Sequence, residues 1–334
     1  MKSPHILTMF LAASALALTS VNAQTTVTSD VVGYTTSTLS AGSGNVYAPA
    51  FAKSPSISAV LTSISSGSSS TLSTATSLSS GAYDETSDVT GVSKGYPQYY
   101  VEITNDTNSS DSLDTEGVIL DIVSNSSTAV VVGVDVSALG LQGDEAFVIR
   151  EHITLSELFA NSTLTGYADA VSIYNEDGPG TAVAHVADGA GNWLLISDYT
   201  TSSNDAPIYP GTGFVLNNSA DVVVTAVGAV KETATQVPVY GNSYVNILGS
   251  MKPLTSATVA SELLDGLTAY GDVCTPYSLD GTLTGGDAFV STGTGFVSTS
   301  DYTTPVTPTV NGTREAFVVN AGTATVVKIS GNTL

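Results

Sequence analysis

Aromatic side chains next to predicted turns are the residues best placed to bind a ligand. Trp193 lies just beyond a turn in Gly191-Asn192-Trp193-Leu194, and Tyr199 and Tyr209 follow it. The face of an exposed aromatic ring attracts the polarised C–H groups of a sugar. We therefore predict Trp193, Tyr199 and Tyr209 as carbohydrate-binding residues, with packing in the core as the alternative for Trp193.

Calcium coordination is a second chemistry that the residue types allow. Asn175-Glu176-Asp177-Gly178 combines oxygen donors with turn residues, as calcium loops require. The spacing fits neither an EF-hand nor a nonapeptide calcium repeat. Asn175, Glu176 and Asp177 are the predicted calcium ligands, with a solvent-facing turn as the alternative, and no other cofactor is expected.

The motifs of the common catalytic classes are absent from the sequence. Beyond residue 23 the chain has two histidines, His152 and His185, and it has no Gly-x-Ser-x-Gly elbow, zinc motif or P-loop. Two carboxylates could hydrolyse a glycosidic bond, but a sequence with 30 Asp and Glu residues does not single out a pair. We predict no catalytic residue and a protein that is not an enzyme.

Acidic residues outnumber basic ones by 30 to 8, which gives a net charge of −22 at pH 7. Such a surface repels nucleic acid and anionic lipid headgroups, so both are excluded as predicted partners. The partners that remain are further copies of the chain and polysaccharides.

The first residues have the pattern of a secretory signal. Lys2 precedes a mostly apolar stretch at residues 6–18, and Val21-Asn22-Ala23 fits a signal-peptidase site. We predict that residues 1–23 are a signal peptide and that the mature chain is secreted, to the extracellular space or cell surface, with the periplasm as the alternative. No later segment is long and apolar enough to span a bilayer.

Strand-forming residues alternate with turn residues along most of the chain. The sequence is 42% hydrophobic and 11% charged, a balance that favours a buried core over disorder. Runs rich in Val, Thr and Ile predict strands at residues 128–136, 221–230 and 315–319. Residues 323–329, after Asn320-Ala321-Gly322, predict a terminal hairpin. The predicted fold class is all-β.

Two local patterns interrupt the strands. Thr154-Leu155-Ser156-Glu157 fits a capping box that opens a short helix, with Leu158 and Phe159 turned inward. Cys274 is the only cysteine, so no internal disulfide can form, and its apolar neighbours favour burial as a small hydrophobic residue.

An internal repeat is the most informative feature of the sequence. The copies are Ser156-Glu157-Leu158-Phe159 with Ser261-Glu262-Leu263-Leu264, Leu164–Asp169 with Leu267–Asp272, and Gly211-Thr212-Gly213-Phe214-Val215 with Gly293-Thr294-Gly295-Phe296-Val297. Because the offset between copies falls along the chain, we predict a duplication whose second copy is shorter and lacks the hairpin of Trp193. Asp169 and Asp272 are predicted to fix turns through backbone hydrogen bonds, with calcium binding as the alternative.

These patterns divide the chain into four regions. Residues 1–23 are the signal peptide, and residues 24–150 form an N-terminal β region in which the Ser- and Thr-rich residues 62–93 are an extended, mobile insertion. Residues 151–236 form the first β repeat unit and residues 237–334 the second, shorter one. The predicted architecture is a tandem of β-sandwich or barrel-like units with one or two short helices.

Several short motifs, in their order along the chain, resemble an uncharacterised paralogous family of secreted β-rich proteins from verrucomicrobial bacteria. They are Val31–Tyr34, Tyr99–Thr104, Glu116-Gly117, Gly143-Asp144, Ile149–Leu155, Leu158-Phe159, Ala168-Asp169, Trp193 and Pro210–Phe214. The resemblance implies export, and it implies no activity, cofactor or catalytic residue. The second half departs from the pattern because it has no equivalent tryptophan.

Export, duplication, hydroxyl-rich strands and missing catalytic motifs together favour a structural or surface-associated protein. Such a protein would assemble with its own copies or act in adhesion and the extracellular matrix. The alternative is a carbohydrate-binding module, assisted by calcium, that serves a polysaccharide-utilisation system.

Overall fold

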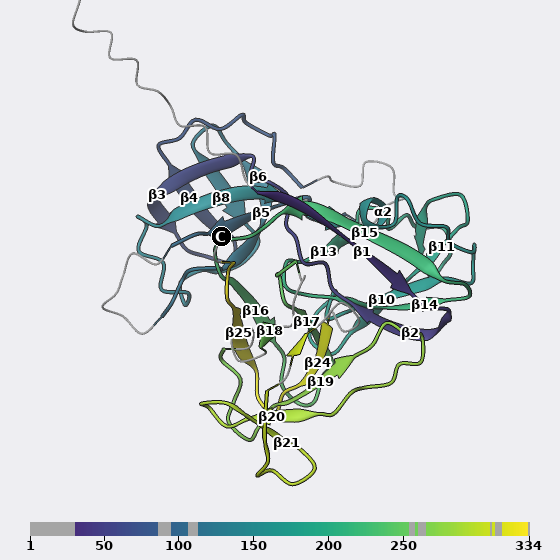
Figure 1. Ribbon diagram of the computed structural model, residues 1–334. Coiled ribbons are helices and arrows are strands. Elements are labelled where there is room, and N and C mark those ends of the chain that lie inside the picture. The colour runs from purple at the N-terminus through teal and green to yellow at the C-terminus, as the bar shows by residue number, and fades with distance from the viewer. Residues whose placement is uncertain are drawn as a thin grey trace, which may run out of the picture. The chain divides into compact units, whose positions relative to one another are not determined.

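Strands are the dominant regular element of the computed structural model, and its described part has one short helix, which confirms the predicted all-β class (Figure 1). The structure describes residues 31–85, 95–105, 113–253, 258–259, 265–307, 309–310 and 316–332. The predicted signal peptide and residues 86–93 of the predicted insertion lie outside these ranges. Val31–Leu334 cluster as one unit.

Six strands close into a barrel in the order β3-β4-β7-β6-β5-β8. They are β3 (Ile57–Ser65), β4 (Ser70–Thr74), β5 (Tyr99–Ile103), β6 (Ile119–Asn125), β7 (Ala129–Val132) and β8 (Ala146–Glu151). Alternate side chains such as Leu61, Leu72 and Phe147 fill the interior, as the two-residue period of a strand requires.

The predicted insertion at residues 62–93 is wrong in its described first half, because the end of β3 and all of β4 belong to the barrel. In β4 the side chains of Ser70, Leu72 and Thr74 point inward and those between them point outward. The Ser and Thr composition concealed this alternation from the sequence-based prediction.

The strands of a first β unit come both before and after the barrel strands in the sequence. Its strands are β1 (Val32–Leu39), β2 (Gly42–Tyr47), β9 (Ile153–Thr154), β10 (Ala170–Tyr174), β11 (Ala182–Ala187), β12 (Trp193–Leu195), β13 (Pro207–Ile208), β14 (Phe214–Asn218) and β15 (Val222–Ala229). They form a β12-β11-β10-β14-β2 sheet and the pairs β1-β15 and β13-β9. Because β1 and β2 pair with β15 and β14, the predicted boundary at residue 150 does not separate two self-contained sheets.

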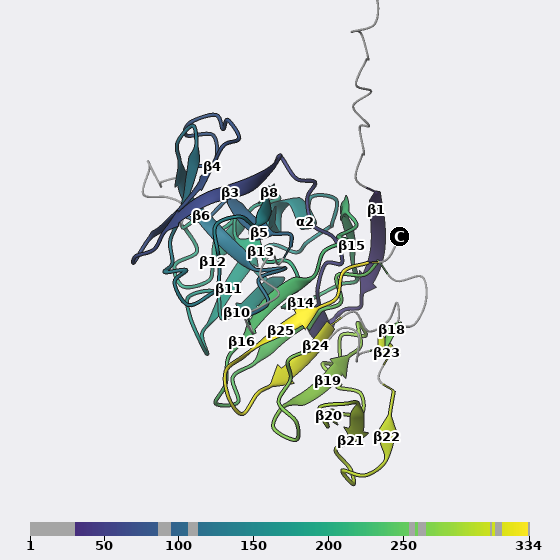
Figure 2. The ribbon, with the colours of Figure 1, turned by 90° about the vertical axis from the view of Figure 1, so that its left-hand side faces the viewer.

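A second β unit follows without an inserted barrel (Figure 2). Its strands are β16 (Thr235–Val239), β17 (Asn246–Gly249), β18 (Thr258–Val259), β19 (Val273–Tyr277), β20 (Phe289–Ser291), β21 (Phe296–Ser298), β22 (Pro305–Val306), β23 (Thr309–Val310), β24 (Ala316–Asn320) and β25 (Thr325–Ile329). They form a β17-β24-β19-β20-β21-β22 sheet and the pairs β16-β25 and β18-β23.

The two β units have the same pairing pattern, apart from β22, an additional edge strand of the second unit. Val171 of β10 lies between His185 and Leu216, and Cys274 of β19 lies between Phe289 and Val319. Trp193 pairs with Ala187 on the neighbouring strand, as Phe296 does with Ser291.

The observed strand pairing corrects three expectations. The second unit does contain the hairpin that was predicted to be missing, as β20 and β21, with Phe296 in the place of Trp193. Phe214 corresponds to Phe317 rather than to Phe296, because both face the central strand of their sheets in the same register. The terminal hairpin is wrong too, since β24 pairs with β17 and β19 while β25 pairs with β16.

Local predictions fared better. Helix α2 (Leu155–Leu158) begins after Thr154 with both hydrogen bonds of the capping box, and Leu158 and Phe159 are buried as predicted. Cys274 is a buried free cysteine, which confirms its assignment as a small core residue. Burial raises the pKa of its thiol, so the sulfur stays protonated and unreactive.

A buried ion-pair cluster joins the barrel to the segment that links the two β units. Glu102 on β5 accepts a hydrogen bond from Arg150 Nε on β8 (2.8 Å) and lies 2.7 Å from Lys231 Nζ. The three side chains are at most 9% exposed. Burial raises the pKa of the Glu102 carboxyl, but the charges of Lys231 and Arg150 outweigh this and hold it below its ordinary value.

Candidate functional site

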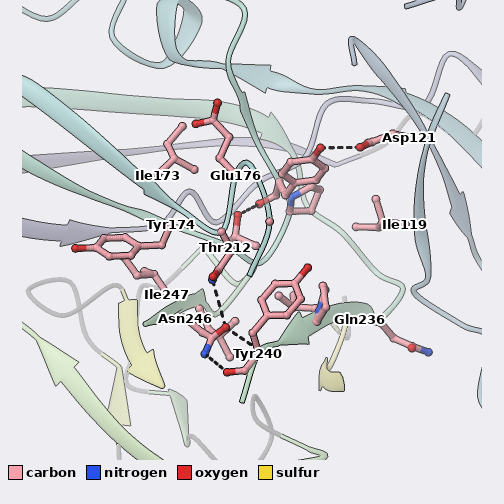
Figure 3. Close-up of a pocket in the computed structure, with 18 of the residues that line it drawn as sticks. Ile119, Asp121, Ile173, Tyr174, Glu176, Thr212, Gln236, Tyr240, Asn246 and Ile247 are labelled. Carbon is pink, nitrogen blue, oxygen red and sulfur yellow. Dashed lines mark hydrogen bonds between the residues drawn. The ribbon is translucent and has the colours of Figure 1, made fainter. Parts of the chain in front are cut away.

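Tyr209 follows β13, and its phenol reaches across to the barrel. Its hydroxyl donates a hydrogen bond to Asp121 Oδ2 on β6 (2.6 Å), drawn as the dashed line to Asp121 in Figure 3. Burial raises the pKa of Tyr209, and the charge of Asp121 raises it further. The hydroxyl therefore stays protonated and keeps its bond to the carboxylate.

His152 supports the same carboxylate from the interior. Its Nε2 lies 3.0 Å from Asp121 Oδ1, and its ring packs between Tyr100 (4.7 Å between centroids) and Tyr209 (4.8 Å). Because an ionised carboxylate only accepts hydrogen bonds, Nε2 carries the proton. The imidazole is fully buried whereas 35% of the Asp121 side chain is exposed, so of these two side chains the carboxylate is the one that a ligand can reach.

A second buried histidine holds a second carboxylate. His185 Nε2 on β11 lies 2.8 Å from Glu176 Oε2, and the two side chains are 0% and 4% exposed. Glu176 follows Asn175, whose backbone is left-handed at φ 61°. This turn at the end of β10 directs Glu176 back against β11.

These groups lie at a cavity of about 530 Å³ where the barrel and the two β units meet (Figure 3). The barrel contributes Ile119, Leu120, Asp121, Gly133 and Val134, the first β unit Ile173–Glu176, Gly178, Tyr209, Pro210, Thr212 and Gly213, and the second Gln236–Pro238, Tyr240 and Asn246–Leu248. Three half-buried tyrosines, Tyr174, Tyr209 and Tyr240, are among the residues that line it. In Figure 3 the Glu176 carboxylate points away from the Tyr240 side.

Two asparagine amides hold the loops that shape the cavity. Asn246 Nδ2 donates to the backbone oxygens of Tyr240 and Val319, and Asn246 Oδ1 accepts from the Tyr240 amide. Asn175 Nδ2 donates to Val245 O, and Asn175 Oδ1 accepts from the Gly180 amide. The wall of the cavity is thus held by hydrogen bonds from asparagine side chains to the backbone.

Of the three predicted carbohydrate-binding residues, one lines the cavity. Tyr209 does so. Tyr199 lies elsewhere, 50% exposed, with its ring 6.1 Å from that of Tyr167. The prediction for Trp193 is wrong, because the side chain is 1% exposed and packs against Phe159 in the core.

Two of the three predicted calcium ligands are held by other groups of the protein. Asn175 is engaged with backbone groups and Glu176 with His185. In the described part of the chain, no three acidic, histidine or cysteine side chains gather as a metal site would need. The predicted role of Asp169 and Asp272 in turns is confirmed, since each accepts a backbone hydrogen bond of 2.7 Å, from Thr165 and Thr268.

The sequence-based prediction missed Asp121, Tyr174 and Tyr240. The cavity assembles them from three segments that are far apart in sequence, and only the pairing of strands brings them together. The one available signal was His152, a rare residue directly after β8, whose partner could not be identified without the barrel.

No family model matches this chain, and neither the curated proteins nor the solved structures contain a match to it. Within the ranges that the structure describes, no helix is long and apolar enough to cross a membrane. Function therefore has to be argued from the cavity and the exposed surface.

Proposed function

We propose that the protein binds a saccharide in the cavity walled by Tyr174, Tyr209 and Tyr240. The observation that carries this proposal is the combination of three tyrosines with the partly exposed Asp121 carboxylate around one cavity. Aromatic faces suit the C–H side of a sugar ring, and a carboxylate suits its hydroxyls. At about 530 Å³ the cavity falls in the size range of small-ligand sites, roughly 300–1,000 Å³.

Binding without cleavage is part of the proposal. A glycosidase needs one carboxyl that gives up a proton and a second that acts as base or nucleophile. Asp121 already accepts hydrogen bonds on both oxygens, from Tyr209 and His152. Glu176 is 4% exposed and paired with His185. Neither carboxylate is placed as a proton donor to a bound sugar.

Export, surface location and duplication remain part of the same proposal. The signal-like residues 1–23 and the resemblance to secreted verrucomicrobial proteins support an extracellular or cell-surface role. The shared strand register of the two β units supports an ancient duplication. The strongly acidic composition, at −22, favours a neutral saccharide over an anionic one.

A glycan array followed by calorimetry tests the cavity. Tyr240→Ala should weaken binding of the best saccharide about tenfold, because one aromatic contact contributes on the order of 1.4 kcal/mol. Tyr34→Ala removes an aromatic ring that is 74% exposed on β1 and should leave affinity unchanged. Equal affinities of the two variants, or no saccharide bound at all, would contradict the proposal, and turnover in a glycosidase screen would contradict its non-enzymatic part.

Self-association is a second candidate function, favoured by one surface. The outer face of the β1-β15 pair exposes Val32 (62%), Tyr34 (74%), Val223 (47%) and Val227 (57%). Both strands of a two-stranded sheet are edge strands, and exposed apolar side chains on such a sheet favour pairing with another chain. Light scattering should show oligomers of the wild type and monomers of Val227→Lys, whereas a monomeric wild type would rule this candidate out.

A further inference from the structure

Four tyrosines adopt a backbone conformation that disfavours any side chain with a Cβ atom. Tyr167 and Tyr199 have φ of 57° and 57° in the first β unit, and Tyr270 and Tyr302 have φ of 56° and 56° in the second. Glycine, asparagine and aspartate are the usual residues in this left-handed region. The backbone conformation therefore does not explain why tyrosine occupies these positions.

Core packing does not explain these tyrosines either. Tyr167, Tyr199, Tyr270 and Tyr302 are 62%, 50%, 61% and 53% exposed. Strained residues that persist in a fold mark functional positions when no packing reason accounts for them. At each of these positions the strained backbone places a phenol ring in contact with solvent.

Tyr167 in the first β unit and Tyr270 in the second are held by corresponding backbone hydrogen bonds. The Tyr167 amide donates to Ala187 O (2.7 Å), and the Tyr270 amide donates to Ser291 O (2.8 Å). Ala187 and Ser291 occupy the same position, beside Trp193 and Phe296 respectively.

The second tyrosine of each pair lies in an identical peptide, Ser-Asp-Tyr-Thr-Thr, at residues 197–201 and 300–304. The Tyr199 amide donates to Leu195 O (2.8 Å) and the Tyr302 amide to Ser298 O (2.9 Å). Hydrogen bonds from the threonines that follow lower the pKa of Asp198 and of Asp301 to about 2. Both turns therefore keep their carboxylate cap through mildly acidic pH.

In the first β unit the two exposed rings meet. The centroids of Tyr167 and Tyr199 are 6.1 Å apart at an interplanar angle of 44°. Two tilted neighbouring rings present a continuous apolar surface whose negative faces suit the C–H groups of a pyranose ring. The polar rim of Asp198, Thr200 and Thr201 lies beside it.

We propose that Tyr167 with Tyr199, and Tyr270 with Tyr302 at the corresponding backbone positions of the second β unit, form two stacking sites for the pyranose rings of a neutral polysaccharide chain, so that each protein binds the polymer bivalently. The sites share the ligand class of the proposed function but none of the cavity residues. A negatively charged protein repels acidic polymers, which favours a neutral polymer over an acidic one. Two sites on one molecule make the second contact with the same polymer intramolecular.

The test measures retention on microcrystalline cellulose, chitin and insoluble xylan. Tyr199→Gly and Tyr302→Gly remove the ring while glycine accepts the left-handed backbone, so both variants should fold with an unchanged or higher Tm. Each single variant should lower the apparent affinity for the retaining polymer about 100-fold, because one of two linked sites is lost. The double variant should not be retained, and the matched Tyr199→Phe/Tyr302→Phe variant should be.

Three results would overturn the inference: no retention of the wild type on any of the polymers, full retention of the double glycine variant, or a lower Tm with retention intact, which would show a structural role. The outcome is separable from that of the cavity. Loss of polymer retention in the glycine variants, with no effect of Tyr240→Ala on soluble oligosaccharide binding, supports these sites alone. The opposite pattern supports the cavity alone.

Discussion

The two β units share a pairing pattern but differ in the side chains that it presents. Cys274 stands where the first unit has Val171, and Phe296 stands where it has Trp193, so the core positions stay apolar. By contrast, the first unit has His185, paired with Glu176, at the position that Phe289 occupies in the second. The apolar character of the core is thus the same in both units, while the buried pair of His185 and Glu176 next to the cavity is found in the first.

Insertion is the other difference between the units. The whole barrel lies between β2 and β9 in the first unit, whereas only residues 250–257 separate β17 from β18 in the second. The barrel supplies Asp121, and Tyr209 of the first unit binds it. The shared pairing pattern therefore supports the fold, while the cavity also needs the barrel that is inserted into the first unit.

Removing the corresponding core aromatics should have the largest effect. Trp193 and Phe296 are 1% and 7% exposed, so Trp193→Ala and Phe296→Ala should each lower the free energy of unfolding by about 3–5 kcal/mol. Urea denaturation measures this, with the exposed Tyr34→Ala as a control that should stay within about 0.5 kcal/mol. A Phe296→Ala variant as stable as the wild type would contradict the correspondence between the two hairpins.

Glu102→Gln should follow, at about 3 kcal/mol, because it leaves Arg150 and Lys231 buried without their carboxylate. The control is Glu151→Gln, whose carboxylate is 44% exposed and pairs with Lys53, and which should cost no more than about 1 kcal/mol. Equal stability of the two variants would show that the buried cluster does not hold the barrel.

The same cluster predicts a pH dependence with a defined sign. The pKa of Glu102 in the folded protein lies below its ordinary value of 4.5, so its stabilising contribution is complete above that pH and is lost as the pH falls below it. Stability curves of the wild type should therefore drop below about pH 4.5, and those of Glu102→Gln should drop less steeply. Parallel curves would remove Glu102 from the explanation of acid unfolding.

The smallest effect is expected for exchanging the residues at one core position. Cys274→Val and Val171→Cys each place in one unit what the other already holds, and each should cost less than about 1.5 kcal/mol. Cys274→Ser is the contrasting variant, since a buried hydroxyl without a partner should cost about 1–3 kcal/mol. Thermal melts that rank the serine variant above the valine variant would contradict the assignment of Cys274 to the core.

Local patterns in the sequence predicted local structure well. The capping box of Thr154 and Glu157 and the turn carboxylates Asp169 and Asp272 involve residues within four positions of each other, so the motif contains its own partners. The all-β class followed from residue types alone. These predictions needed no knowledge of strand pairing.

Long-range pairing could not be read in the same way. The predicted match of Gly211–Val215 with Gly293–Val297 rested on similar residue types. The registers of β14 and β24 show instead that Phe214 corresponds to Phe317. Ser-Asp-Tyr-Thr-Thr, which is identical in both units, would have given the right offset. The site was missed for the same reason, because Asp121 and Tyr209 are 88 residues apart in the sequence and only the folded chain brings them together.

Hydrogen–deuterium exchange with the saccharide that binds best tests the central claim, a saccharide site at the junction of the barrel and the two β units. Bound saccharide should slow exchange in residues 173–178, 209–213 and 236–248 together, because these segments line one cavity. Protection of a single segment, protection only at other surfaces, or no protection at saturation would contradict it.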